Sequence, residues 1–137
     1  MAKLVCKILG AGFILVGLIG FIAPNFLGMH LSPTHNVIHL LSGAAALYLG
    51  FAGTYSAART FCSVFGAVYL MLGLLGFVAP GLVANLINAH HVSDTANGLT
   101  PDNLVHIVLG AVFLVGGLAR QTMTNPLPND TTIPHGR

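Results

Sequence analysis

The sequence predicts an all-α integral membrane protein with four transmembrane helices. They form two parallel two-helix repeats related by a pseudo-twofold axis along the membrane normal. Composition indicates a membrane, because 55% of residues are hydrophobic and 6% charged, whereas a soluble domain has roughly 25% charged residues. Two motifs each occur twice: GLIGFIAP (17–24) returns as GLLGFVAP (73–80), and NVIHLLSG (36–43) as NLVHIVLG (103–110). Because a repeat determines architecture, each copy is predicted to be one helical hairpin.

The two copies differ by one insertion. The first motif returns after 56 residues (73 − 17) and the second after 67 (103 − 36), so the second copy carries 11 extra residues (67 − 56). Repeat one covers 3–53 and repeat two 59–119, within a transmembrane domain of residues 1–120. Residues 121–137 are a polar, proline-containing tail without apolar periodicity.

Four apolar runs approach the ~20 residues that cross a bilayer core. They cover 4–23, 37–52, 61–79 and 104–118. The second and fourth runs are the shorter ones. We expect these helices to begin earlier, at Pro33 and Pro101, because each proline follows a hydroxyl residue able to cap a helix N-terminus.

Each run carries two glycines separated by seven residues, which places both on one helix face. These pairs are Gly10 and Gly17, Gly43 and Gly50, Gly66 and Gly73, and Gly110 and Gly117. Small residues let helix backbones approach closely in lipid, so we expect these faces to pack against other helices. A groove lined for a substrate or pigment is the alternative.

The basic residues predict the orientation. With four spans, Lys3, Lys7, Arg59, Arg120 and Arg137 all fall on one side of the membrane. The positive-inside rule makes that side cytoplasmic, so both termini are cytoplasmic and the loops 24–35 and 80–101 lie outside. These scattered basic residues do not indicate nucleic-acid binding.

Histidines are the candidate functional residues, because polar groups at membrane depth are costly. His39 and His106 occupy equivalent positions in the two motifs, and His35 and Asp102 precede them by four residues. Residues four apart share a helix face, so these four side chains form a candidate metal site for zinc, copper or iron. His39 and His106 are also candidate axial ligands of haem or chlorophyll.

The favoured interpretation needs no cofactor. A buried polar group requires a hydrogen-bond partner, and Asn36 and Asn103 lie three residues before the two equivalent histidines. We expect the asparagines to satisfy backbone amides in the first helical turn and the histidines to hydrogen-bond between the repeats. Cys6 and Cys62 are also equivalent; they are interpreted as small buried residues, with a reactive thiol pair as the alternative.

Few signs of catalysis or transport are present. Apart from Lys7 near the start of the first run, the spans contain no Lys, Arg or Glu that would form an ion relay, and no serine lies in a nucleophile-elbow context. We therefore expect a non-catalytic accessory or structural subunit of a larger membrane complex, respiratory or photosynthetic, in contact with lipid and with other membrane subunits. A stand-alone binder of a metal, haem or chlorophyll, and a homo-oligomeric envelope protein, are the alternatives.

Both motifs resemble those of a family of small bacterial four-pass membrane proteins catalogued only as a domain of unknown function. The resemblance rests on G-x-x-G-F (Gly17, Gly20, Phe21; Gly73, Gly76, Phe77) and N-x-x-H-x-x-x-G (Asn36, His39, Gly43; Asn103, His106, Gly110). It implies a four-helix bundle in the bacterial plasma membrane, and it implies no activity.

Overall fold

The computed structural model describes residues 1–29, 31–82 and 101–119, and this part of the chain is helical without a strand. The helices are α1 (Ala2–Ile22), α2 (Pro33–Phe51), α3 (Tyr55–Val78) and α5 (Pro101–Leu118), with a 3-10 turn, η1 (Phe26–Gly28), before α2. The all-helical prediction is confirmed.

Three of these helices, α1, α3 and α5, are long and apolar enough to cross a membrane. This indicates a membrane protein whose apolar helices contact lipid. Helix α2 is not among them, because His35, Asn36, His39 and Ser42 lower the hydropathy of its first half. All four of these polar side chains are buried.

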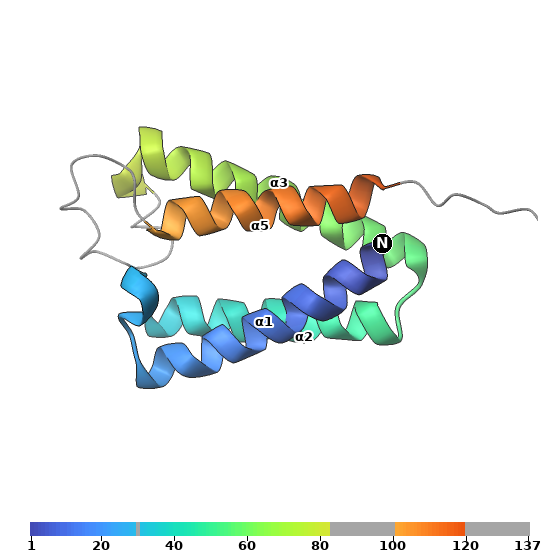
Figure 1. Ribbon diagram of the computed structural model, residues 1–137, viewed down its shortest axis with the longest axis horizontal. Coiled ribbons are helices and arrows are strands. Elements are labelled where there is room, and N and C mark those ends of the chain that lie inside the picture. The colour runs from blue at the N-terminus through green and yellow to red at the C-terminus, as the bar shows by residue number, and fades with distance from the viewer. Residues whose placement is uncertain (30, 83–100, 120–137) are drawn as a thin grey trace, which may run out of the picture.

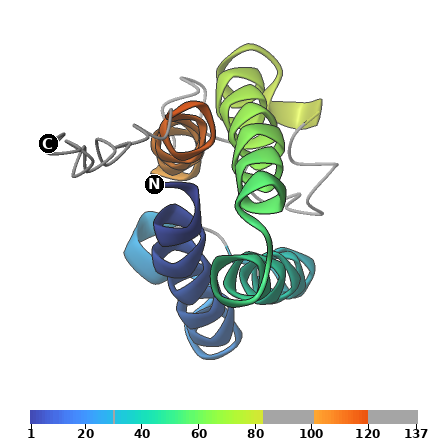
Figure 2. The ribbon, with the colours of Figure 1, turned by 90° about the vertical axis from the view of Figure 1, so that its right-hand side faces the viewer.

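The helices associate in two pairs: α1 packs along α2, and α3 packs along α5. In Figure 1, α1 and α3 run in one direction while α2 and α5 return. The N-terminus and the α2–α3 connection therefore lie at one end of the molecule, and η1 lies at the other. Figure 2 looks along the helices and shows the two pairs facing each other.

Glycines bring the helices of each pair into backbone contact. A Cβ on Gly43 would lie 2.8 Å from the carbonyl oxygen of Gly10, and one on Gly66 would lie 3.0 Å from the carbonyl oxygen of Gly110. Every glycine of the four seven-residue pairs is buried against the other helix of its pair. The prediction that these glycine faces pack against other helices is therefore confirmed. Such close approach increases the dispersion contacts that stabilise helices in lipid.

The second helix of each pair, α2 and α5, begins at the proline where the sequence predicted it. Helix α2 starts at Pro33, and the Ser32 side chain accepts a hydrogen bond from the backbone N–H of His35 at 3.2 Å. Helix α5 starts at Pro101; its predicted cap, Thr100, lies outside the described residues, as does the tail 121–137. The capping chemistry thus places a polar first turn at the end of the molecule opposite the N-terminus.

Cysteines meet where α1 crosses α3. The sulfur atoms of Cys6 and Cys62 are 3.5 Å apart, and both side chains are fully buried. The Cys6 thiol approaches the Ala58 carbonyl oxygen at 3.9 Å, and the Cys62 thiol approaches that of Ala2 at 3.7 Å. The prediction that both cysteines are buried is confirmed, and they are free thiols.

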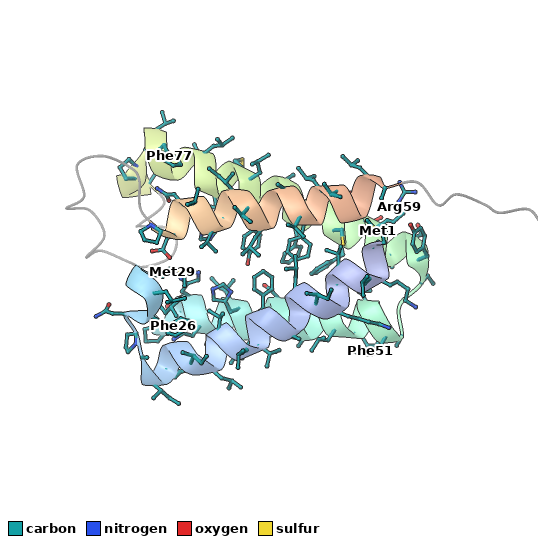
Figure 3. The ribbon with its side chains drawn as sticks, viewed as in Figure 1. Met1, Phe26, Met29, Phe51, Arg59 and Phe77 are labelled. Atoms are coloured by element: carbon teal, nitrogen blue, oxygen red, sulfur yellow. The ribbon has the colours of Figure 1, made fainter. Side chains whose placement is uncertain are left out.

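At the end of the molecule where the chain begins, basic side chains contact the C-termini of helices. Lys3 Nζ donates to the Phe51 carbonyl oxygen at 3.5 Å, Lys7 Nζ lies 4.6 Å from the centre of the Phe51 ring, and Arg59 Nε donates to the Gly117 carbonyl oxygen at 2.9 Å. Figure 3 shows Phe51 and Arg59 at this end. Cations are favourable there because the last carbonyls of a helix carry partial negative charge.

Candidate functional site: a histidine and aromatic cavity

Three histidines project into the space between the helix pairs. His35 and His39 lie in the first two turns of α2 and are 4% and 6% exposed; His106 lies in the second turn of α5 and is 8% exposed. The spacing of four residues puts His35 and His39 on the buried face, and the Ser32–Pro33 start of α2 sets their depth.

These histidines join two other rings in a closed cycle, which we call the five-ring cluster (Phe13, His35, His39, Tyr69 and His106). The distances between ring centroids are 5.2 Å for Phe13 and His39, 4.4 Å for His39 and His35, and 6.0 Å for His35 and His106. They are 5.3 Å for His106 and Tyr69, and 5.4 Å for Tyr69 and Phe13, which closes the cycle. Neighbouring planes differ by only 18–34°. The cluster thus ties α1, α2, α3 and α5 together at one level.

All five rings line one cavity of about 170 Å³. Its remaining lining is mostly apolar, from Gly12 and Val16 of α1, Met29 and Leu31 of the loop after η1, and Val105 and Leu109 of α5. Asp102 also lines the cavity. The structure therefore brings the four predicted site residues, His35, His39, Asp102 and His106, around a single space.

A hydrogen bond fixes the tautomer of His106. Its Nδ1 lies 2.6 Å from the backbone carbonyl oxygen of Asp102, one turn earlier in α5. A carbonyl oxygen only accepts, so Nδ1 carries the proton and donates. In the neutral ring, Nε2 is then the unprotonated nitrogen and can only accept a hydrogen bond.

This bond differs from the predicted network, because His106 bonds within its own helix and not to the other pair. His39 Nδ1 is buried and has no hydrogen-bond partner among the described residues.

Asn36 also differs from the prediction. Its side-chain amide nitrogen donates to the Leu31 carbonyl oxygen at 3.4 Å, while its Oδ1, the atom that would accept from a backbone N–H, has no hydrogen-bond partner among the described residues. Its side chain lies against Gly20 so closely that a Cβ there would overlap the carboxamide, and Asn103 lies against Gly76 in the same way. The second glycine of each G-x-x-G-F motif therefore makes room for an asparagine of the partner helix.

Ring orientation bears on the metal hypothesis. Among the described residues, no group of three or more His, Cys, Asp or Glu side chains is arranged to hold a metal ion. The reason is visible in the rings: His35 and His39 are stacked with 26° between their planes. A metal binds an imidazole in the ring plane along the nitrogen lone pair, so stacked rings do not converge on one ion. Metal ligation by His35, His39, Asp102 and His106, and tetrapyrrole ligation by His39 and His106, remain predictions.

Phe13 and Tyr69 were not identified as site residues from the sequence. They occupy the same position in the two repeats, 56 residues apart, and the structure buries both, at 3% and 6% exposure. An aromatic residue at the same register in both copies was the signal that could have found them. Three further histidines of the sequence, His30, His90 and His91, lie outside the described residues.

Residues 3–119 match the family model described as Domain of unknown function (DUF4383). Because the match covers most of the chain, the chain belongs to this family, as the two repeated motifs predicted. No curated protein and no solved structure matches the chain. The description names no activity, so functional inference depends on the geometry above.

Proposed function

We propose that this protein is a non-catalytic accessory subunit of a larger bacterial membrane complex, such as a respiratory or photosynthetic assembly. The observation that carries the proposal is the apolar outer surface. Only 28% of the spanning window is buried in α1 and in α3, and 33% in α5. Large apolar side chains such as Leu15, Val64 and Val115 point outward, and this surface can pack against lipid or against other membrane helices.

The proposed architecture has four spans. Helix α2 has 19 residues, which at ~1.5 Å per residue gives ~28 Å, close to the ~30 Å bilayer core. Its polar residues His35, Asn36, His39 and Ser42 are buried, whereas Val37, Ile38 and Leu41 are exposed. An outward apolar face with an inward polar face suits a span within a bundle.

Matched contacts support a pseudo-twofold relation between the pairs. The Cys6 thiol approaches the Ala58 carbonyl oxygen, and the Cys62 thiol approaches that of Ala2. These contacts are equivalent, because Cys6 corresponds to Cys62 and Ala2 to Ala58 at the repeat offset of 56 residues. Gly20 against Asn36 and Gly76 against Asn103 form a second matched set. Both helix pairs enter the bilayer in the same direction in this arrangement, with the N-terminus and the Arg59 end in the cytoplasm of a bacterial inner membrane.

A scarcity of acidic groups supports a non-enzymatic role. The whole chain contains three acidic residues and no glutamate, and proton or ion relays in membranes use such groups. Asp102 is the acidic residue at the cavity, and among the described residues glycine contacts within the pairs and ring contacts between them make up much of the packing. These features favour a rigid scaffold that presents its outer surface.

The test is gentle detergent extraction followed by native electrophoresis and mass spectrometry of the band. Co-migration with the same set of other membrane subunits in independent preparations is the expected result. A free monomer would contradict the proposal, and a pure homo-oligomer would support the envelope-protein alternative instead.

Binding of a metal or tetrapyrrole is the second candidate function, because three histidines line one cavity. An absorption spectrum and elemental analysis of purified protein test it. A Soret band, or stoichiometric metal that is lost in His39→Ala, would favour this candidate over the subunit proposal.

A further inference from the structure

We propose that a polar cleft at one end of the second helix pair binds the phosphate group of an anionic phospholipid. The cleft has a volume of about 270 Å³ and lies between the first turns of α3 and the last turn of α5. We call it the hydroxyl cleft, because its polar lining consists of Ser56, Arg59, Thr60 and Ser63. The proposal requires that α3 and α5 cross a bilayer, for which both are long and apolar enough. It is independent of whether the protein assembles with other subunits.

Hydroxyl groups supply hydrogen-bond donors on one face of α3. Ser56, Thr60 and Ser63 follow the spacing i, i+4 and i+7, which places them along a single helix face. Within the described part of the chain, these three hydroxyls make no hydrogen bond to another residue. Ser56 and Thr60 are exposed, whereas the exposed residues further along α3, such as Val64 and Met71, are apolar. Hydrocarbon offers a hydroxyl no partner, so this part of α3 fits a polar neighbour.

Arg59 supplies the positive charge. Its Nε donates to the Gly117 carbonyl oxygen at 2.9 Å, which fixes the guanidinium beside the end of α5 (Figure 3). The terminal nitrogens keep donors that can hold a phosphate through two parallel hydrogen bonds. Among the described residues the only acidic side chain is Asp102, in the first turn of α5, far along that helix from Gly117. No described carboxylate therefore neutralises Arg59, and an anion in the cleft would do so.

Depth in the bilayer indicates a lipid as the source of the phosphate. Helix α5 has 18 residues, which at ~1.5 Å per residue span ~27 Å, close to the ~30 Å hydrocarbon core. Gly117 is the residue before its last, so Arg59 meets α5 where the core ends and lipid headgroups begin. Val64, one turn deeper in α3 than Thr60, continues the cleft with an apolar side chain that is 54% exposed. A phosphate joined to an acyl chain matches both parts, whereas free phosphate matches only the polar part.

Comparison of the repeats separates this cleft from general helix-end chemistry. Lys3 corresponds to Arg59 at the offset of 56 residues, and each donates to a carbonyl oxygen at the end of its partner helix. A basic residue is therefore explained in both pairs by contact with a helix C-terminus. The hydroxyls are not repeated, since Thr60 corresponds to Leu4 and Ser63 to Lys7. Arginine together with hydroxyls, the combination that suits a phosphate, is a feature of the second pair.

The experiment titrates purified full-length protein in detergent with phosphatidylglycerol, followed by native mass spectrometry at constant ionic strength. Phosphatidylcholine with the same acyl chains is the comparison, because its choline cation cancels the phosphate charge. We expect one phosphatidylglycerol per chain, bound about tenfold more tightly than phosphatidylcholine. Inorganic phosphate, titrated calorimetrically into the lipid-free protein, should give no saturable binding.

Two matched pairs of variants locate the site. Thr60→Val keeps the shape of the side chain and removes the hydroxyl, and it should weaken phosphatidylglycerol binding by about tenfold. Thr34→Val makes the same change at an exposed threonine in the first turn of α2, and it should bind like the wild type. Arg59→Gln should abolish the preference for the anionic lipid, whereas Lys3→Gln should retain it.

Three results would overturn the proposal. Equal binding of phosphatidylglycerol and phosphatidylcholine would show that the cleft does not select an anion. Equal losses within either matched pair would show that the lipid is held by the general charge of this end of the protein and not by the hydroxyl cleft. Inorganic phosphate bound as tightly as phosphatidylglycerol would show that the ligand is a soluble phosphate.

Discussion

Glycine and asparagine form a complementary pair at the residue scale. The carboxamide of Asn103 occupies the place that a Cβ on Gly76 would take. Adding one methyl group there forces the asparagine or the α5 backbone to move, and such overpacking costs about 1–3 kcal/mol. We therefore expect Gly76→Ala to lower the free energy of unfolding by this amount, measured by denaturant titration in mixed micelles.

Gly12→Ala is the control for this prediction. It adds the same methyl group to a helix, but at a position where nothing lies within 4 Å, so the free energy of unfolding should stay unchanged or rise by up to about 1 kcal/mol, because alanine is a better helix former than glycine. Similar losses in both variants would mean that Asn103 does not fill the space beside Gly76.

The tautomer of His106 gives a second prediction at this scale. Because Nδ1 donates to the Asp102 carbonyl oxygen at 2.6 Å, the neutral ring should carry its proton on Nδ1. Two-bond ¹H–¹⁵N correlation spectra of ¹⁵N-histidine-labelled protein, assigned with His106→Gln, distinguish the tautomers. Protonation of Nε2 alone would show that this hydrogen bond is not formed.

Single residues were only partly predictable from the sequence. Repetition identified His39 and His106, because a polar residue kept at one register in both copies is conspicuous among apolar neighbours. Phe13 and Tyr69, which complete the cluster, were missed although they share a register in the two repeats, because aromatic residues are ordinary in apolar helices. The hydrogen bond of His106 to its own helix was also missed, because an i−4 backbone partner leaves no mark in the sequence.

At the scale of elements, contacts within the helix pairs differ in kind from contacts between them. Backbones meet at glycines within each pair, whereas rings and thiols fill the space between the pairs. The glycine faces were predictable, because a seven-residue spacing defines a face whatever helix lies opposite. Which helices cross at Cys6 and Cys62 was not, because the crossing depends on how the two pairs pack together.

A crosslink tests that crossing. The sulfurs of Cys6 and Cys62 are 3.5 Å apart, whereas a disulfide has a sulfur–sulfur distance of ~2.05 Å, so a small change of side-chain rotamer brings them into bonding range. Iodine, a small apolar oxidant, should convert the two thiols to an intramolecular disulfide and be reduced to iodide. Mass spectrometry should show a loss of two hydrogens.

Cys62→Ser serves as the control, because it should show no such loss. A charged maleimide should label neither cysteine of the folded wild type, since both side chains are fully buried. Rapid maleimide labelling, or oxidation only to dimers between chains, would contradict the observed contact between α1 and α3.

At the scale of the whole molecule, the proposed four-span architecture requires α2 to cross the membrane. Its hydropathy alone does not select it as a span, because hydropathy averages over all faces of a helix, including the buried His35, Asn36 and His39. If α2 crosses, the η1 loop and the α2–α3 connection lie on opposite sides of the bilayer. If it does not, both lie on the same side.

Single cysteines in a Cys6→Ala, Cys62→Ala background decide between these arrangements. Leu27, which is 74% exposed in η1, and Ala52, exposed after α2, are the positions to replace. An impermeant maleimide added to intact spheroplasts should label Leu27→Cys at once and Ala52→Cys only after the membrane is permeabilised, because Lys3, Lys7 and Arg59 hold the Ala52 end in the cytoplasm. Labelling of both positions before permeabilisation would show that α2 does not cross the membrane. Labelling of Ala52→Cys alone would show that the protein has the opposite orientation in its membrane.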